Sequence, residues 1–269
     1  MMTPHVLDNT TRRVTIIKDH VLTIPELYLE VYIGPGPDSE RRPFNEFFAK
    51  ARCNKADTPE QADLVVFVGG DDVDPALYGA KRHETTFFNT NRDKEEIELF
   101  QKCHEGGIPM FGVCRGAQFL HVMHGGKLYQ DVNNHVGDHS IYLKRESRIL
   151  HNVSSVHHQM CIFDETLGME LLADSSAATE RWLDPDTYVK GQRFDCEAYF
   201  YRDTCTFGVQ GHPEYKGYNY FADWVYKSLN SLIIENPDMT LINRVRRIKP
   251  DILEERRAIK KNLLQKELN

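Results

Sequence analysis

A cysteine lies between two glycines in the run FGVCRG, residues 111–116. Cys114 follows a short apolar stretch and precedes a helix-like pattern, so a tight turn there would join a buried strand to a helix. Such an elbow exposes the sulfur at the N-terminus of the helix, where the helix dipole favours the thiolate, and where free backbone N–H groups can hold a developing oxyanion. A cysteine flanked by glycines is equally consistent with a buried packing residue, so the motif alone leaves both interpretations open.

A nucleophilic cysteine needs a base, and the later run GVQGHPEY supplies a candidate. His212 follows a strand-like segment, and Glu214 lies two residues further on, beyond Pro213. Proline fixes the backbone between the two side chains. A carboxylate placed there accepts a hydrogen bond from one imidazole nitrogen and directs the other nitrogen toward the sulfur. On its own, HPE is an ordinary turn sequence.

Elements that could position these residues alternate along the first half of the chain. Apolar runs that stop abruptly are typical of strands buried on both faces of a parallel sheet, and the patterns between them have the spacing and ends of helices. This alternation predicts an open α/β sheet flanked by helices. The predicted strands are RVTIIKD, ADLVVFVGG and IPMFGV, and the predicted helices are RRPFNEFFAKARC, NRDKEEIELFQKCHEGG and GAQFLHVMHGG.

From about Lys127 the sequence pattern changes to short strand signals separated by polar turns. An amphipathic helix is predicted after them, in YFADWVYKSLNSLII. No linker or internal repeat interrupts the chain, so one domain spanning residues 10–236 is predicted. Residues 237–269 are predicted to form a helical extension. From Thr240 onward this segment holds nine Lys or Arg against four Asp or Glu. It is either a solvated terminal helix or an arm that docks onto a partner or a second copy.

Composition excludes several classes of protein. The 269 residues carry a formal net charge of −7, so nucleic-acid binding is not expected. No signal peptide or long apolar run is present, which predicts a soluble cytoplasmic protein without a membrane span. The six cysteines lack a secretory context or CxxC spacing, and are expected to be reduced thiols. Histidines and aspartates between 121 and 139 could suggest a metal cluster, but their spacing is imperfect and no metal is expected.

Read in order, GVCRGAQ, GGKLYQD, HHQ and GVQGHPE resemble the motifs of the class I glutamine amidotransferase domain. The segment GGDDVDPALYG, residues 69–79, resembles the GGxDVxPxxYG segment of the peptidase-like γ-glutamyl hydrolases, including those that cleave γ-glutamyl-γ-aminobutyrate. Five ordered motifs between Ala62 and Tyr215 are far more specific than any one of them. The resemblance implies an α/β fold of the flavodoxin-like type, a three-layer sandwich around a mostly parallel sheet, with a Cys-His-Glu triad.

The resemblance also implies roles for individual residues. Cys114 matches the nucleophile, His212 the general base, and Glu214 the group that orients the base. The oxyanion hole matches the backbone amides of Gly70 and Arg115. The residues that match substrate-binding positions of the family are Gln118, one turn into the helix, and Ser155, Val156 and His157 of the VSSVHHQ segment.

Further expectations concern the surroundings of this site. Neighbouring histidines in a strand point to opposite faces, so of His157 and His158 one is expected to line the pocket and the other to pack. Asp71, Asp72 and Asp74 are expected in capping and turn roles rather than as cation ligands. The family usually has a large aromatic residue before HPE, whereas this chain has Gly211, which is expected to loosen a wall near the triad. The PELYLEVYIGPGPD segment departs from the hydrolase branch as well.

The implied chemistry is attack of the Cys114 thiolate on the γ-carbonyl of glutamine or of a γ-glutamyl amine, followed by hydrolysis of the thioester. Neither a metal nor an organic cofactor is required. The expected partner is a small γ-glutamyl amide. One alternative is a glutaminase component that delivers ammonia to a synthetase, which the basic C-terminal segment and Gly211 would suit. A second alternative is a non-catalytic binding module on the same fold, against which the complete Cys-His-Glu set argues.

Overall fold

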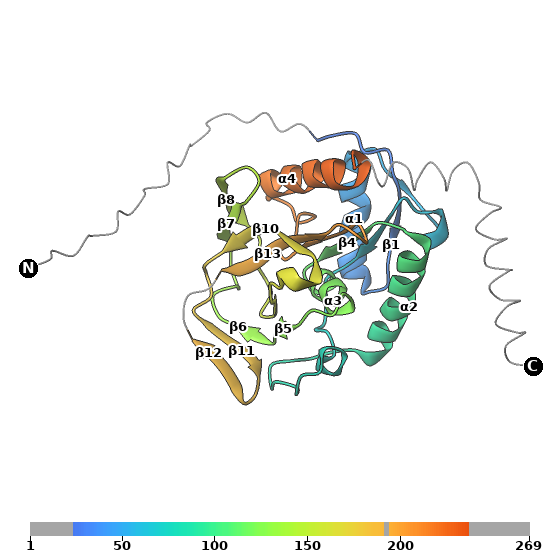
Figure 1. Ribbon diagram of the computed structural model, residues 1–269. Helices are drawn as coiled ribbons and strands as arrows, with labels where there is room; N and C mark the ends of the chain where they lie inside the picture. The colour runs from blue at the N-terminus through green and yellow to red at the C-terminus, as the bar shows by residue number, and fades with distance from the viewer. Residues whose placement is uncertain (1–23, 191–193, 237–269) are drawn as a thin grey trace, which may run out of the picture.

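The computed structural model describes residues 24–190 and 194–236, and these form a layered α/β structure (Figure 1). Four α-helices and a terminal π-helical turn are present in the described residues: α1 (Asp38–Lys50), α2 (Thr90–Gly106), α3 (Arg115–Met123), α4 (Asn219–Leu229) and η4 (Asn230–Ile234). The strands are β1 (Glu30–Ile33), β2 (Asn54–Lys55), β3 (Leu64–Phe67), β4 (Met110–Val113), β5 (Leu128–Tyr129), β6 (Asp131–Val132), β7 (His139–Leu143), β8 (Arg148–Val153), β9 (Met160–Cys161), β10 (Met169–Ser175), β11 (Glu180–Asp184), β12 (Thr187–Lys190), β13 (Asp195–Tyr201) and β14 (Thr206–Val209). Three short 3-10 turns are η1 (Pro59–Gln61), η2 (Pro75–Tyr78) and η3 (Glu165–Leu167).

The central sheet has nine strands in the order β2-β1-β3-β4-β14-β13-β10-β7-β8. The pairings from β2 to β14 are parallel, and those from β14 to β8 are antiparallel. The sheet therefore has a parallel half and an antiparallel half that meet at β14. Two small sheets, β12-β11-β6 and β5-β9, complete the strand structure of the described residues.

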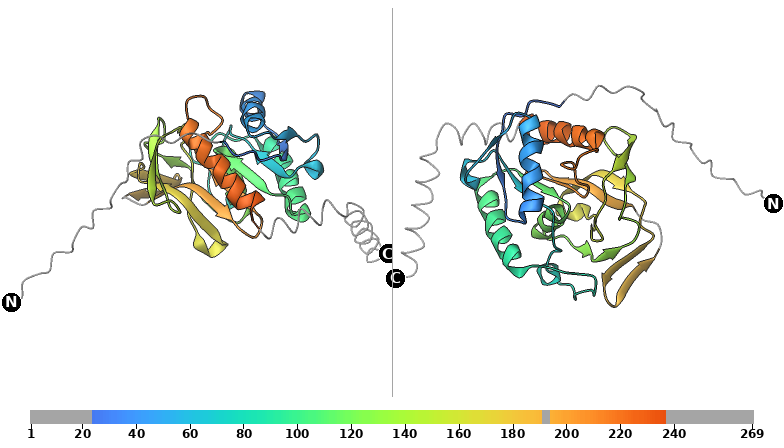
Figure 2. Two further views of the ribbon diagram at one scale, coloured as in Figure 1. Left: turned by 90° about the horizontal axis from the view of Figure 1, so that it is seen from above. Right: turned by 180° about the vertical axis from the view of Figure 1, so that it is seen from behind.

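Helices cover both faces of the sheet because its central strands are apolar on both sides. In β3, Val66 packs into the hydrophobic core that contains α1 and α4, whereas Val65 and Phe67 pack into the core that contains α2 and α3. All of these side chains are fully buried. The α1 and α4 helices lie side by side (Figure 2), where the rings of Phe47 and Tyr226 stack with centroids 4.2 Å apart. The result is the three-layer α/β sandwich that the sequence predicts.

The predicted elements correspond closely to those observed. The runs predicted as strands at ADLVVFVGG and IPMFGV contain β3 and β4, and the predicted helices overlap α1, α2, α3 and α4, each of which begins one to three residues before its predicted start. The segment EVYI, for which no strand was predicted, forms β1 between β2 and β3. The predicted strand RVTIIKD and the predicted helical extension at residues 237–269 lie outside the described residues. Among those described, no helix has both the length and the apolar composition needed to cross a bilayer.

The start of α3 lies directly on β3, and glycine makes this approach feasible. A Cβ atom added at Gly116 would lie 2.0 Å from the carbonyl oxygen of Phe67. This neighbour is backbone in the centre of the sheet, so it has no flexible side chain that could move away. Gly116 therefore sets the distance between the helix that begins after Cys114 and the sheet beneath it.

We predict that Gly116→Ala destabilises the protein by about 1–3 kcal/mol, because the added methyl group must push α3 away from β3. Urea unfolding followed by circular dichroism measures the free energy of unfolding. Ser231→Ala, at an exposed position near the end of the described chain, is the control and should change stability by less than about 0.5 kcal/mol. A Gly116→Ala variant as stable as this control would contradict the prediction.

Candidate active site

Cys114 lies between the end of β4 and the start of α3. Its backbone has φ 52° and ψ −115°, a conformation that is strained for a residue with a side chain. This is the strand-to-helix elbow that the sequence predicts. The Cys114 amide donates to the carbonyl of Val209 at the end of β14, at 2.8 Å. Because β4 and β14 are adjacent and parallel, the nucleophile candidate and the segment that follows β14 meet at the same edge of the sheet.

That segment carries His212, and several contacts fix its orientation. The His212 amide donates to Ser154 Oγ at 2.7 Å, and the imidazole ring stacks on Tyr215 with centroids 4.3 Å apart. His212 Nδ1 donates to Glu214 Oε1 at 2.7 Å. The His212 side chain is 2% exposed and that of Glu214 is fully buried, so this hydrogen bond is shielded from water. The His-Glu pair predicted from HPE is therefore formed.

The imidazole of His212 and the side chain of Cys114 meet above Gly69. A Cβ atom built on Gly69 would lie 3.0 Å from His212 Cε1 and 3.8 Å from Cys114 Cβ. His212 Nε2 has no partner of good hydrogen-bond geometry in the described part of the chain. Loose geometry of this kind is common in active sites before substrate binds.

The charge state of His212 follows from its neighbours. Burial lowers the pKa of His212, but its interactions with the Cys114 sulfur and the Glu214 carboxylate outweigh that effect and raise the pKa to about 10. At neutral pH the imidazole therefore carries a second proton beside the sulfur. A thiolate paired with an imidazolium is the reactive form of a cysteine nucleophile.

A cavity of about 230 Å³ opens next to the elbow. It brings together six of the nine residues that the sequence assigns to the site: Gly70, Cys114, Arg115, Gln118, Val156 and His157. The other residues lining it are Asp71, Asp72, Phe87, His158 and Gln159. Four segments from different parts of the sequence thus enclose one small space at the sheet edge.

Within the VSSVHHQ segment the side chains diverge. Ser155 is buried and donates through Oγ to the carbonyl of His135. Its hydroxyl is therefore hydrogen-bonded within the protein interior. His157 is also buried, and burial lowers its pKa to about 3. His158 is more exposed and lies 3.2 Å from Asp72. Both histidines border the cavity, although only His158 reaches toward solvent.

The backbone at Gly70, which is predicted to form part of the oxyanion hole, packs against a buried arginine of α2. Gly70 has φ 129°, and a Cβ atom there would lie 2.3 Å from Arg92 Nη1. Arg92 in turn donates to the carbonyl of Val68 at 2.8 Å and to Glu96 at 3.1 Å. This buried arginine of α2 holds the backbone at the end of β3, and no sequence motif distinguishes it from the other charged residues of the helix.

The side chain of Arg115 has a separate role from its backbone amide. It is buried and forms ion pairs with Asp93 and Glu96 of α2. Burial lowers the pKa of Arg115 to about 9, yet two carboxylates compensate its charge. The start of α3 is therefore anchored to α2 directly beside Cys114.

Glu40, in the first turn of α1, is a second carboxylate at the triad that the sequence analysis missed. It offers an oxygen within 4.8 Å of ligand atoms of both His212 and Glu214. Its Oε2 lies only 2.9 Å from the Cβ position of Gly69. Nothing in the sequence could place it there, because it lies 74 positions before Cys114. Its helix, α1, covers the face of the sheet opposite to α3.

The expectation that Gly211 loosens a wall is wrong. A Cβ atom at Gly211 would lie 2.7 Å from Val153 and 2.9 Å from both Phe221 and the Ser154 carbonyl. The space that an aromatic residue would need is already filled by β8 and α4. Asp72 and Asp74 act as predicted in turns, since Asp72 accepts from the Phe87 amide and Asp74 from the Ala76 amide.

Comparison with known proteins agrees with this arrangement. The chain is 30% identical to protein NtpR of Enterococcus hirae over 178 residues, which are 58% of this chain and 68% of NtpR. It is 35% identical over 118 residues to the YvdE homolog of Lactococcus lactis subsp. cremoris, which is described by its name as glutamine amidotransferase-like. That match covers 36% of this chain and 63% of the relative, less than two thirds of its length.

The fold has counterparts among solved structures. A glutamine amidotransferase from Thermotoga maritima superposes with a TM-score of 0.50 at 17% identity, covering 82% of this chain and 93% of that protein. The family model described as peptidase C26 matches residues 50–214. The matched region begins at the end of α1 and ends at Glu214, so it contains the elbow, the cavity and the His-Glu pair. The chain belongs to the peptidase C26 family, whose members are glutamine amidotransferase-like.

Proposed function

We propose that this protein hydrolyses the γ-amide bond of glutamine or of a γ-glutamyl amine through a thioester on Cys114. The observation that carries the proposal is the meeting of a strained cysteine elbow with a buried His212–Glu214 pair at the ends of adjacent parallel strands. Membership of the peptidase C26 family supports the same chemistry.

The reaction follows from the charge states at the site. The Cys114 thiolate attacks the γ-carbonyl carbon, and the N–H groups of Gly70 and Arg115 stabilise the resulting oxyanion. The His212 imidazolium gives its proton to the departing amine, which leaves the γ-glutamyl group as a thioester. The neutral His212 then takes a proton from water as that water attacks the thioester, and glutamate is released.

The charge at the cavity entrance supports a proposal about the class of leaving group. Asp71 borders the cavity and is exposed, so it places negative charge at the entrance. This charge attracts an ammonium group and repels a carboxylate. We infer that γ-glutamyl amines with a neutral or cationic amine portion are better substrates than γ-glutamyl-γ-aminobutyrate, whose amine portion carries a carboxylate.

The proposal is tested by offering the purified protein glutamine, γ-glutamyl methylamide and γ-glutamyl-γ-aminobutyrate, and by measuring glutamate and amine release. We expect turnover by the protein alone, highest with the methylamide. Cys114→Ala should reduce kcat by at least about 10⁴-fold because the thioester cannot form. Cys53→Ala is the matched control and should retain activity, since Cys53 is a half-buried thiol beside α1.

Other outcomes separate the alternatives. Turnover of glutamine only after a synthetase is added would favour an ammonia-delivering glutaminase. Absence of turnover, together with failure of a glutamine-like electrophile to label Cys114, would favour a non-catalytic binding module. Either result contradicts the proposed stand-alone hydrolase.

A second prediction concerns the proton on His212. Glu214→Gln removes a carboxylate from Nδ1 and should lower the pKa of His212 from about 10 by at least one unit, as read from an NMR titration of the imidazole. Because the native pKa exceeds the unfolded value of about 6.5, the stabilisation from His212 is complete below pH 6.5 and is lost as the pH rises through 10. Glu84→Gln, at an exposed position, should leave the titration unchanged.

A third prediction concerns the oxyanion loop. Gly70→Ala would place a methyl group against Arg92 and force a φ of 129° on a residue with a side chain, so the Gly70 amide should move. We expect kcat to fall by about 10²–10³-fold, the usual cost of one oxyanion donor, while electrophile labelling of Cys114 persists. In contrast, Gly79→Ala meets no atom within 4 Å and should leave kcat close to wild type. Equal kcat in the two variants would exclude Gly70 as a donor.

A further inference from the structure

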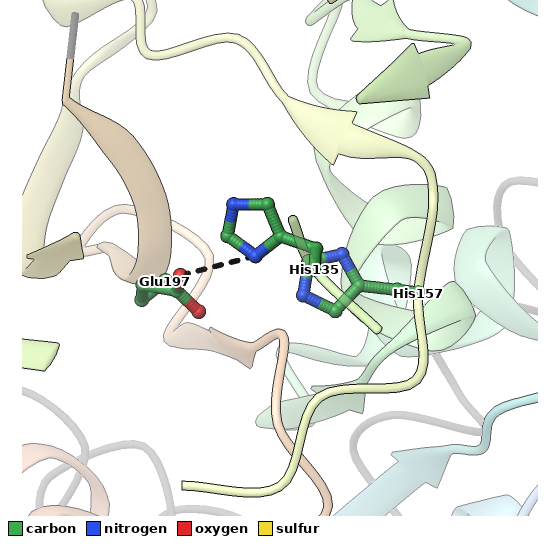
Figure 3. Close-up of side chains that lie close together, drawn as sticks. All are labelled: His135, His157 and Glu197. Carbon is green, nitrogen blue, oxygen red and sulfur yellow. Dashed lines mark ion pairs between the residues drawn. The ribbon is translucent and has the colours of Figure 1, made fainter. Parts of the chain in front are cut away.

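A second group of ionisable side chains lies behind the cavity, in the antiparallel half of the sheet. It consists of His135, which precedes β7, His157, which lies between β8 and β9, and Glu197 of β13. The two imidazole rings and the carboxylate gather around one point (Figure 3). One nitrogen or oxygen atom of each lies within 4.8 Å of the others, and the residues are 0%, 3% and 2% exposed.

The hydrogen bonds of the two histidines fix which nitrogen carries a lone pair. His135 Nε2 lies 3.1 Å from Asp195 Oδ2, and His157 Nδ1 lies 2.9 Å from the carbonyl oxygen of Gln159. Both of those oxygens are acceptors, so each of these nitrogens carries the hydrogen. Gln210 Nε2 lies 3.2 Å from His157 Nδ1 and donates instead to the Gln159 carbonyl at 3.1 Å. His135 Nδ1 and His157 Nε2 are then unprotonated, as metal-ligating nitrogens are.

The atoms of these three residues that could bind a metal ion include three that make no hydrogen bond. His135 Nδ1, His157 Nε2 and Glu197 Oε2 are buried and make no hydrogen bond in the described part of the chain. Burying two imidazole lone pairs and a carboxylate oxygen without a hydrogen-bond donor costs free energy of folding. His135 Nδ1 lies 3.7 Å from Glu197 Oε1, which is an ion-pair distance but too long for a hydrogen bond.

The surroundings of the three residues match the outer shell of a metal site. Glu197 Oε1 accepts from His139 Nε2 at 2.7 Å and from Ser175 Oγ at 2.8 Å. Asp195, which holds His135, accepts from the Ala178 amide at 2.9 Å. Histidine ligands oriented by a carboxylate or a backbone carbonyl, and a ligating carboxylate that is itself hydrogen-bonded, are the usual supports of a bound metal.

We propose that His135, His157 and Glu197 bind one Zn²⁺ ion. Two imidazoles and one carboxylate are a donor set that zinc prefers, and a water molecule would complete the tetrahedron. Three atoms within 4.8 Å of one another allow an ion at most about 2.8 Å from each, and shifts of less than about 1 Å bring these distances to the usual 2.0–2.2 Å. The ion would bind to residues that each bury a nitrogen or oxygen atom without a hydrogen bond in the described part of the chain.

The role of the ion follows from where its ligands lie. His157 belongs to the segment that borders the cavity beside Cys114 and Gln118. Zinc would tie this segment to β13 and to the loop before β7, and so fix one wall of the substrate cavity. The proposed ion has this structural role and takes no part in the proposed hydrolysis.

The test measures metal content and does not depend on activity. The full chain is loaded with Zn²⁺, dialysed, and assayed by inductively coupled plasma mass spectrometry, and its affinity is measured by competition with a chromophoric chelator. We expect one zinc per chain. Glu197→Gln keeps the side-chain shape and should weaken zinc binding at least about 100-fold, because loss of only an outer-shell partner already costs about 10–100-fold.

The matched control is Glu40→Gln, the same substitution at the only other group of described residues close enough to hold an ion, the one with His212 and Glu214. It should retain zinc with wild-type affinity. Loss of zinc in this control would place the ion at the triad and overturn the proposal, as would a wild-type chain that retains no zinc or a Glu197→Gln variant that binds it unchanged. If Glu197→Gln is unfolded by circular dichroism, His135→Gln replaces it with the same expectation.

Discussion

In the middle of the sheet, β4 and β14 run in parallel with Val113 opposite Val209, and the Cys114 amide donates to the carbonyl of Val209. The positions of the thiol and of His212 both depend on this pairing. A slip of one residue in the register would shift the segment after β14 by about 3.3 Å and turn its side chains to the other face. Packing opposes such a slip, since Phe111 and Val113 of β4 and Phe207 and Val209 of β14 all pack into the core that contains α1 and α4.

Around this pair, buried charges keep the neighbouring backbone in place. Arg115 is neutralised by Asp93 and Glu96, and Arg92 holds the carbonyl of Val68 beneath Gly70. Removing either partner of such a pair leaves an uncompensated charge in the interior, which is strongly destabilising. The loop and the helix terminus that supply the two proposed oxyanion donors are thus fixed by one cluster on α2. Rigid donors of this kind cost little reorganisation when charge develops.

The sequence predicted most of what depends on local pattern. Apolar runs and helix ends located β3, β4, α2 and α3, and the motifs at Cys114 and HPE identified the thiol and its His-Glu neighbour. What it missed depends on long-range packing. Glu40 and Arg92 reach the site from helices on opposite faces of the sheet, and no spacing rule relates them to Cys114. The steric consequence of Gly211 was misjudged because the space beside it is filled by Val153 and Phe221.

The histidine and carboxylate group behind the cavity was missed for the same reason. His135 was considered with its sequence neighbours, whereas the structure places it beside His157 and Glu197 through pairings among antiparallel strands. At the boundary of the two halves, the Gln210 amide donates to the carbonyl of Glu197, two residues before His212. The thiol and the His-Glu pair thus follow the parallel strands β4 and β14, whereas one wall of the cavity, residues 156–159, follows β8 of the antiparallel half. Divergent descendants of this chain could therefore acquire new substrates by changing one half of the sheet while inheriting the other intact.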